Sequence, residues 1–325
     1  MRLYKSVKLR LSGELYRKHL LPYWRFYAAF LHSEKSGTSK EYLKNFMFIQ
    51  FMSELSIFLV GGSLSIPFIY FCWEKLLSKS RGDDYPGILI FEGIAVVKPD
   101  AADFHMLRYE MNDILMDAFL DGIVRERDNY GEGPYELGEH VRLKSGDIVI
   151  DCGANMGVFS SLAAHKGCKV YAFEPSGAVV DRYLRHVAHY MPGITICPYA
   201  LGDRKGELLL YVHRTNIGGT KTAETNINDG MEGFHHPVTV PVTTIDDYVF
   251  ANGIPRVDFI KADIEGAERN MLRGATRVLR EFAPKLAICT YHLPDDPKVL
   301  REIILSANPE YKIVERYKKM YAYVP

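Results

Sequence analysis

The second half of the chain alternates short apolar runs with segments of helical length. The apolar runs lie at residues 148–150, 169–173, 194–197, 257–262 and 285–291. Strands separated by helices favour right-handed βαβ crossovers, and therefore a mainly parallel sheet with helices on both faces. In such a sheet the ligand lies beyond the carboxyl ends of the strands. We therefore expect the chemistry of this α/β protein in the turns that follow the strands.

The first third of the chain has a different pattern. Residues 55–73 form a run of 19 residues without a charge, about as long as a membrane span. Gly61, Gly62 and Pro67 interrupt this run, and its aromatic side chains do not concentrate at its ends, so a buried helix followed by a buried strand or second helix is the favoured interpretation. Membrane association through residues 46–73 and a homodimer face stay open as alternatives.

The rest of the N-terminal region also reads as packing elements. Two β-rich runs within residues 88–98 flank a Glu-Gly pair and predict a hairpin. Apolar residues recur at helical spacing over 103–121 and predict an amphipathic helix. No chemical motif stands before residue 140. We therefore interpret residues 1–140 as a helical and hairpin cap region, and residues 141–325 as the functional domain.

Composition narrows the class of protein. The 325 residues contain 40 Lys+Arg and 40 Asp+Glu, and this zero net charge disfavours a chain whose main task is binding nucleic acid. No apolar segment with a cleavage site follows the basic N-terminus, so a secretory signal is not predicted. An odd, scattered set of cysteines without a CxxC pair indicates reduced thiols and a cytoplasmic location. These cysteines are Cys72, Cys152, Cys168, Cys197 and Cys289.

A glycine-rich turn follows the first strand of the predicted sheet. Gly153 and Gly157 would let the backbone approach a ligand, and the next helix would offer free N–H groups. Glu174 ends the next strand, 21 residues beyond Gly153, which is near the spacing typical of an acid that binds ribose hydroxyls. The turn and the acid together predict a cofactor that contains a nucleoside.

The details of the turn favour S-adenosylmethionine. Asn155 stands where the GxGxxG pattern of dinucleotide-binding proteins has its second glycine, and no Lys-Ser or Lys-Thr pair follows to make a phosphate loop. Asp151 places a carboxylate at the head of the turn, which suits a cofactor with a cationic amino group and sulfonium. A nicotinamide-dependent oxidoreductase stays as the alternative.

Four segments together resemble the FkbM-type methyltransferase family. They are residues 149–160 (VIDCGANMGVFS), 172–175 (AFEP), 244–247 (TIDD) and 258–268 (DFIKADIEGAE). The resemblance implies a Rossmann-like class I methyltransferase with a seven-stranded sheet, in which residues 311–324 supply an antiparallel hairpin. It also implies S-adenosylmethionine as the cofactor and methylation of a hydroxyl group.

The same resemblance implies the cofactor-binding residues. Those around the methionine part, the ribose and the adenine would be Asp151, Gly153, Ala154, Asn155, Gly157, Glu174, Pro175, Ala200, Leu201 and Asp263. Tyr199 departs from the small or amide residue expected beside the adenine.

Candidate catalytic residues follow the later strands. Asp263 and Glu265 leave the strand at 257–262, so they should lie near the cofactor methyl group. Lys261 would pair with these acids or act directly, and His292 after the next strand is a candidate base. The long loop at 213–237, which contains His213, His235 and His236, is a candidate substrate lid.

With the cofactor motifs, the resemblance implies an O-methyltransferase acting on a hydroxyl of a small molecule, sugar or glycan. Asp263, Glu265 and His292 would make a suitable oxygen and nitrogen set for a metal, but no metal-specific spacing supports one, so none is predicted. Apart from the oxidoreductase, the remaining alternative is a non-catalytic, membrane-associated scaffold of the same fold.

Overall fold

The computed structural model describes residues 88–91, 94–97, 110, 134–211, 221–222 and 237–325. The apolar run at 55–73 and nearly all of the predicted helix at 103–121 lie outside these residues. So does the proposed lid at 213–237, apart from residues 221–222 and 237.

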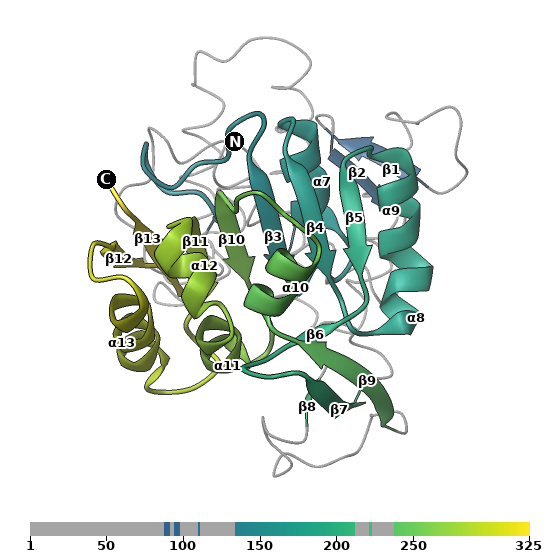
Figure 1. Ribbon diagram of the computed structural model, residues 1–325. Helices are drawn as coiled ribbons and strands as arrows, with labels where there is room; N and C mark the ends of the chain where they lie inside the picture. Colours follow the sequence, from purple (N-terminus) through teal and green to yellow (C-terminus); the bar gives the residue numbers. More distant parts are fainter. Residues whose placement is uncertain (1–87, 92–93, 98–109, 111–133, 212–220, 223–236) are drawn as a thin grey trace, which may run out of the picture. The chain divides into compact units, whose positions relative to one another are not determined.

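A seven-stranded sheet forms the centre of the domain (Figure 1). Its strand order is β12-β13-β11-β10-β3-β4-β5. Five strands are parallel, whereas β13 runs antiparallel to both of its neighbours. The strands are β3 (Ile148–Cys152), β4 (Lys169–Phe173), β5 (Ile194–Cys197), β10 (Phe259–Ala262), β11 (Lys285–Cys289), β12 (Lys312–Arg316) and β13 (Lys319–Tyr323). The predicted Rossmann-like fold and its C-terminal antiparallel hairpin are confirmed.

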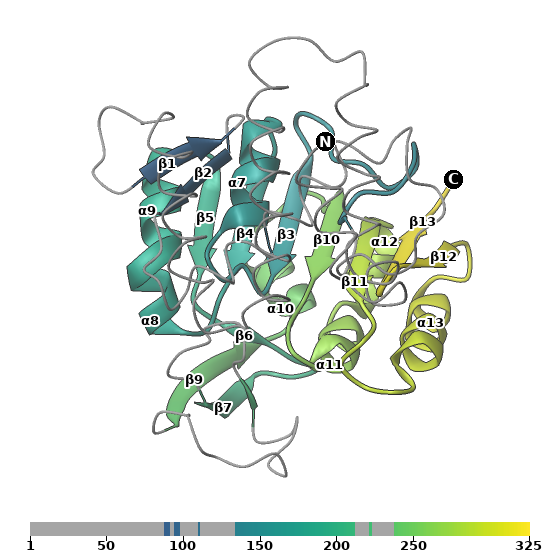
Figure 2. The same cartoon turned by 180° about the vertical axis from the view of Figure 1, so that it is seen from behind.

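Helices cover both faces of the large sheet. Figures 1 and 2 show α7 on one face and α10 and α12 on the other. No helix within the described ranges is long and apolar enough to cross a membrane. The helices are α7 (Val158–His165), α8 (Gly177–Val179), α9 (Arg185–Tyr190), α10 (Ile245–Ala251), α11 (Glu268–Arg273), α12 (Thr276–Glu281) and α13 (Asp296–Ala307), with a π-helical turn at Val180–Leu184 between α8 and α9.

The central strands are apolar because both of their faces are covered. Every residue of β3 and β10 is buried, as expected for parallel strands between two helical layers. Two residues of these strands break the apolar pattern, Asp151 in β3 and Lys261 in β10. Burying a charge is costly unless it is paired, so these two positions require a structural explanation, which the site below provides.

Two smaller sheets accompany the central one. β6 (Ala200–Leu201), β7 (Gly206–Tyr211), β8 (Lys221–Thr222) and β9 (Val238–Thr243) form a sheet in the order β6-β9-β7-β8. Because β6 follows the carboxyl end of β5 after two residues, this sheet begins at the functional edge of the large one (Figure 1). β1 (Ile88–Phe91) and β2 (Ile94–Val97) form the predicted two-stranded sheet.

The structure departs from the sequence expectations in a few element boundaries. The strand expected over 257–262 begins at Phe259. The helical stretch expected over 266–282 is two helices, which separate near Gly274. A side chain at Gly274 would overlap the carbonyl oxygen of Gly202, so this glycine allows the small sheet and the helical layer to pack closely. α13 was not predicted.

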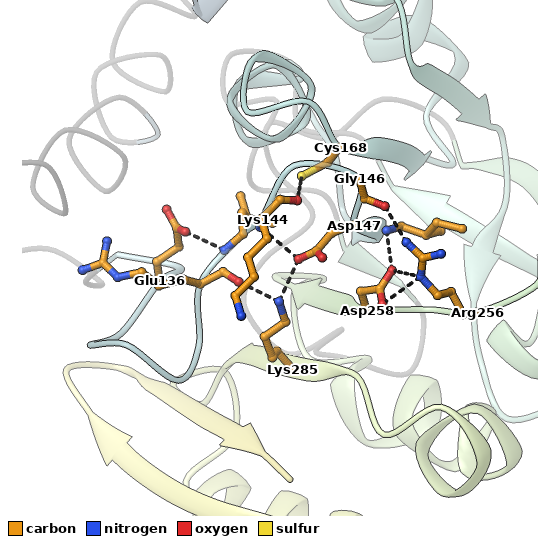
Figure 3. Close-up of polar contacts among 11 residues, drawn as sticks. Glu136, Lys144, Gly146, Asp147, Cys168, Arg256, Asp258 and Lys285 are labelled. Carbon is orange, nitrogen blue, oxygen red and sulfur yellow. Dashed lines mark hydrogen bonds and ion pairs between the residues drawn. The ribbon is translucent and has the colours of Figure 1, made fainter. Parts of the chain in front are cut away.

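A polar network joins the amino ends of the central strands (Figure 3). Lys285 donates to Asp147 over 2.7 Å. Asp258 accepts a 2.7 Å hydrogen bond from the backbone N–H of Ile148 and a 2.8 Å hydrogen bond from Arg256. These contacts tie β3, β10 and β11 together at the edge opposite the carboxyl ends.

We expect Asp258→Ala to lower the free energy of unfolding by about 1–2 kcal/mol, because the Ile148 N–H loses a charged acceptor in a partly buried position. Urea denaturation of the full chain measures this loss. Asp181→Ala is the matched control, since Asp181 forms an exposed pair with Arg185 and should contribute at most about 0.5 kcal/mol. Equal losses in both variants would contradict the role of Asp258.

Candidate cofactor and catalytic site

The glycine-rich turn between β3 and α7 lies against the loop that follows β10. Gly153 has a φ of 77°, in the left-handed region. A side chain at Gly153 would overlap the backbone carbonyl oxygen of Asp263. Glycine is therefore required here for two reasons, its backbone conformation and the close approach of the second loop. The contact places the cofactor turn directly beside the predicted catalytic acids.

Asn155 provides an orphaned polar group within this turn. Its φ is 47°, which is uncommon for a residue with a side chain. Its Oδ1 atom is buried and has no hydrogen-bond partner among the described residues. Buried polar atoms in native proteins are nearly always hydrogen-bonded. An acceptor in this position is therefore suited to a bound ligand.

Glu174 closes the turn from the end of β4. Its Oε2 accepts a 3.0 Å hydrogen bond from the N–H of Asn155, and its Oε1 accepts a 2.9 Å hydrogen bond from the N–H of Ser176. Burial raises the pKa of Glu174 to about 7, against the opposing effect of these two N–H donors. The 21-residue spacing thus brings the acid to the glycine turn, as the sequence predicts.

A buried ion pair supports the turn from within the sheet. Lys261 Nζ lies 3.1 Å from Asp151 Oδ1 and donates a 2.7 Å hydrogen bond to the carbonyl of Gly153. Ser160 donates a 2.6 Å hydrogen bond to Asp151 Oδ2. Burial alone would lower the pKa of Lys261, but the negative charges of Asp151 and Asp263 outweigh it and raise that pKa. The lysine therefore stays charged.

This arrangement changes the interpretation of two predicted residues. The sequence suggested Asp263 and Glu265 as ion-pair partners of Lys261, whereas the structure pairs it with Asp151. Asp151 is fully buried, and its carboxylate is occupied by Lys261 and Ser160. We therefore describe Asp151 and Lys261 as positioning residues, which hold the glycine turn.

Asp263 is the centre of the polar groups at the end of β10. Its Oδ2 accepts a 3.0 Å hydrogen bond from the hydroxyl of Tyr135, and its Oδ1 accepts a 3.2 Å hydrogen bond from the hydroxyl of Tyr291. Burial would raise the pKa of Asp263, but the positive charges of Lys261 and Lys319 outweigh it and lower that pKa. The side chain therefore stays a carboxylate.

His292 joins the acids from the turn after β11. Its Nε2 lies 3.7 Å from both Asp263 Oδ1 and Glu265 Oε2, and its Nδ1 lies 3.1 Å from Glu268 Oε1. Burial alone would lower the pKa of His292, but Glu268, Asp263 and Glu265 together raise it to about 9. In this surrounding the ring is an imidazolium at neutral pH, so a role as base requires that it first lose a proton.

Glu268 has a structural role beside the site. It stands in the first turn of α11. The side chain is fully buried, and its two oxygens accept hydrogen bonds from the N–H groups of Ile264 and Gly266, over 2.8 and 3.0 Å. It thus fixes the loop that carries Asp263 and Glu265.

Sequence reasoning missed three residues of this site. The ring of Tyr135 lies between two buried lysines, with Lys261 Nζ 5.3 Å and Lys319 Nζ 4.2 Å from its centroid. Glu110 has a buried Oε1 without a hydrogen-bond partner in the described part of the chain, and burial raises its pKa to about 8. No motif marks Tyr135, Lys319 or Glu110, because they are distant along the chain from the motif segments and close to them only in the folded protein.

Other predicted site residues lie at the edges of the site. Ala200 and Leu201 form β6, and both are buried. Tyr199 packs edge-to-face against Tyr248, with ring centroids 6.1 Å apart. The remaining members of the predicted set keep their places along the two turns, Ala154 and Gly157 in the first and Pro175 after Glu174. His213, His235 and His236 lie outside the described residues.

A model of the methyltransferase FkbM domain matches residues 151–316, just over half of the chain. The chain belongs to the FkbM methyltransferase family. This membership confirms the family that the sequence motifs predicted. The match runs from Asp151 at the end of β3 to Arg316 at the end of β12, so it includes both turns and the acids of the site and leaves β13 and the N-terminal region outside.

The similarity to individual proteins is lower. The chain is 27% identical over 171 residues to the hexuronic acid methyltransferase AglP of Haloferax volcanii, which is 52% of this chain and 66% of that protein. It is 24% identical over 159 residues to the 31-O-demethyl-FK506 methyltransferase FkbM of Streptomyces tacrolimicus, 41% of this chain and 61% of that protein. The chain thus spans slightly less than two thirds of these relatives.

The similarity to a solved structure from the same family is also low. The FkbM methyltransferase of Methylobacillus flagellatus shows 20% identity and a TM-score of 0.41, with 96% of this chain and 60% of that chain covered. The assignment of the family therefore depends on the match to the FkbM domain and on the site geometry, not on this superposition.

S-adenosylmethionine is the cofactor of the family, and the residues of this site fit it. The glycines of the turn at residues 153–157 let it pack closely against Asp263 and Leu184, and Asn155 Oδ1 is an unused acceptor. Glu174 retains lone pairs for the two ribose hydroxyls. Asn155 and Glu174 therefore provide acceptors that the amino group and the ribose of the cofactor could use.

We expect Lys261→Met to destabilise the protein by about 3–5 kcal/mol, because Asp151 would stay buried without its counter-charge. The double variant Asp151→Asn with Lys261→Met should recover most of this loss, since neither charge remains. Urea denaturation of wild type and both variants measures the difference. A double variant as unstable as the single one would show that the pair does not act as a unit.

Proposed function

We propose that the chain is an S-adenosylmethionine-dependent O-methyltransferase whose acceptor is a hydroxyl of a small molecule, sugar or glycan. The observation that carries this proposal is the contact between the cofactor turn and the loop after β10. Gly153 lies against the carbonyl of Asp263, so a methyl donor bound at the turn would lie close to the acids of that loop.

The cofactor would be held by groups of two turns. Glu174 would accept hydrogen bonds from the ribose hydroxyls, and Asn155 Oδ1 would accept a hydrogen bond from the methionine part. The backbone beside Ala200 and Leu201 would border the adenine. Asp151 and Lys261 would keep the turn in place without touching the ligand.

When bound, the cofactor supplies a methyl group on a sulfonium, which an oxygen nucleophile takes while the carbon–sulfur bond breaks and its electron pair stays on sulfur. The protein must align the acceptor oxygen and receive the hydroxyl proton. Asp263 would accept the hydrogen bond of the hydroxyl, while Tyr135 and Tyr291 hold its carboxylate in position. The proton would pass to the carboxylates of this edge and then to water.

The chemistry of the site favours an acceptor with several hydroxyl groups. Tyr291, Asp263, Glu265 and His292 offer donors and acceptors over a short distance, and a sugar ring can pair with several of them. One relative is named for its action on a hexuronic acid and another for a demethylated FK506 position. Both names are consistent with hydroxyl or carbohydrate acceptors, which supports this class for the present chain.

Family membership goes against the nicotinamide-dependent oxidoreductase that the sequence left open. A non-catalytic scaffold remains the competing proposal, and methyl transfer to an acceptor separates the two. We further propose that the protein acts in the cytoplasm and does not bind nucleic acid, in view of its zero net charge and scattered cysteines.

We expect Asp263→Asn to lower kcat for methyl transfer by about 100-fold or more, because the acceptor oxygen loses its charged partner while the shape of the side chain is kept. Radiolabelled methyl transfer to a panel of monosaccharides and glycosides measures turnover. Asp181→Asn on the surface is the control and should keep wild-type turnover. Full activity of Asp263→Asn would remove this residue from the site, and absence of transfer by wild type to every acceptor would favour the scaffold.

The affinity for S-adenosylhomocysteine should rise with pH through about 7. Glu174 has a pKa of about 7, and the charged groups that face it are Lys261, Asp151 and Glu110. Only the carboxylate accepts hydrogen bonds at both oxygens, so ligand binding favours loss of its proton. From pH 6 to pH 8 we expect about a 10-fold gain in affinity.

Calorimetric titrations at pH 6, 7 and 8 test this linkage, with Glu174→Gln as the matched variant. The variant should bind more weakly at pH 8 and show a flat profile. A wild-type profile that is flat, or a Glu174→Gln profile as steep as that of wild type, would contradict the assignment of Glu174 to the ribose.

A further inference from the structure

His292 occupies an unusual position among three carboxylates. Its side chain is only 9% exposed; Nδ1 pairs with Glu268, whereas Nε2 has no hydrogen-bond partner among the described residues. Buried polar atoms without partners are rare in native structures and commonly mark an absent ion or ligand. The ring comes from the turn after β11, whereas the acids come from the loop after β10 and the start of α11.

The two ring nitrogens face different surroundings. Nδ1 lies 3.1 Å from Oε1 of Glu268, a fully buried carboxylate that two backbone N–H groups already hold. Nε2 faces the other way, 3.7 Å from Asp263 Oδ1 and 3.7 Å from Glu265 Oε2. A carboxylate behind one nitrogen and ligand oxygens before the other is the arrangement of metal-binding histidines, in which the rear acid fixes the tautomer and raises the basicity of the ring.

We propose that Nε2 of His292, with the carboxylates of Asp263 and Glu265, forms a binding site for a divalent cation that displaces the Nε2 proton into solvent, and that Glu268 is the positioning residue of this site.

The distances suit a shared ion. Two ligand atoms about 2.1 Å from one ion lie about 3.0–3.5 Å apart, so 3.7 Å requires only a small movement of the more exposed partners. The cluster whose ligand atoms all lie within 4.8 Å of one another is Asp263, Glu268 and His292, and Glu265 adjoins it through the 3.7 Å approach of its Oε2 to His292 Nε2. One nitrogen and two carboxylates match the preferences of Mn²⁺ and Zn²⁺ better than those of soft metals.

Exposure determines on which side of the ring the ion would lie. Glu268 is fully buried, whereas the side chains of Asp263 and Glu265 are 22% and 43% exposed. An ion at Nε2 would therefore keep coordination positions open toward solvent. Glu265 has a φ of 55°, an uncommon left-handed conformation that persists where function requires it.

The open positions suggest what the ion would do, and this part rests on the proposed function. A cation beside the cofactor turn would bind the oxygen of the acceptor and orient it toward the methyl group. Adjacent hydroxyls of a sugar could occupy two such positions together, which would restrict the acceptors to those with a suitable pair of oxygens. The absence of metal-specific spacing in the sequence is not decisive, because the ligands come from two different turns.

A titration of the chelator-treated full chain with Mn²⁺ tests the site directly. Electron paramagnetic resonance measures the Mn²⁺ that stays free at each step. We expect wild type to bind one Mn²⁺. Glu265→Gln should weaken binding about 10-fold or more, and His292→Ala should abolish it. Glu265 is exposed enough for its variant to fold normally, and Asp181→Asn, which removes a surface acid, should bind as wild type.

Each outcome decides the proposal. Failure of wild type to bind Mn²⁺, or equal binding by wild type, Glu265→Gln and His292→Ala, would overturn it. Methyl transfer at full rate in excess chelator would overturn the role of the ion in holding the acceptor while leaving the methyltransferase intact. Stoichiometric Mn²⁺ binding without any methyl transfer would keep the site and reject the proposed function.

Discussion

The buried pair between Lys261 and Asp151 connects the fold of this protein to its site. The two residues are neighbours in register on the adjacent parallel strands β10 and β3, so they are brought together by the sheet itself. Their charges would be unfavourable separately in the centre of a domain. Together they fix the carbonyl of Gly153, and through it the turn that approaches the cofactor.

The place of this pair follows from the topology of the sheet. The chain enters the sheet at β3 and proceeds outward through β4 and β5, then returns to the other side of β3 with β10 and β11. The strand order therefore changes direction between β3 and β10. The loops that follow these two strands diverge, and ligands of open α/β sheets bind in the gap between such loops. Asp151 and Lys261 lie on the two strands that border this point, directly below both turns.

Much of this architecture could be predicted from the sequence. Apolar runs bounded by Gly-containing turns identified the parallel strands, because strands buried on both faces leave a strong local signal. The separation of Gly153 and Glu174 correctly predicted that the acid reaches the glycine turn, which it meets at the N–H of Asn155. Tyr135 and Glu110 could not be found in this way, because their contacts with the site depend on tertiary packing and leave no local pattern. Asp263 acts on the charge of Lys261 as expected, but the direct ion pair of Lys261 with Asp151 was missed, because strand register and not proximity in sequence determines it.

The loop from Asp263 to Ala267 is held by Glu268, which accepts the backbone N–H groups of Ile264 and Gly266 within the protein interior. Such a loop is already ordered before any ligand arrives, so little conformational entropy is lost there when a complex forms. The acids it carries are consequently preorganised. The backbone that carries Asp263 and Glu265 therefore needs little rearrangement when a ligand meets these side chains.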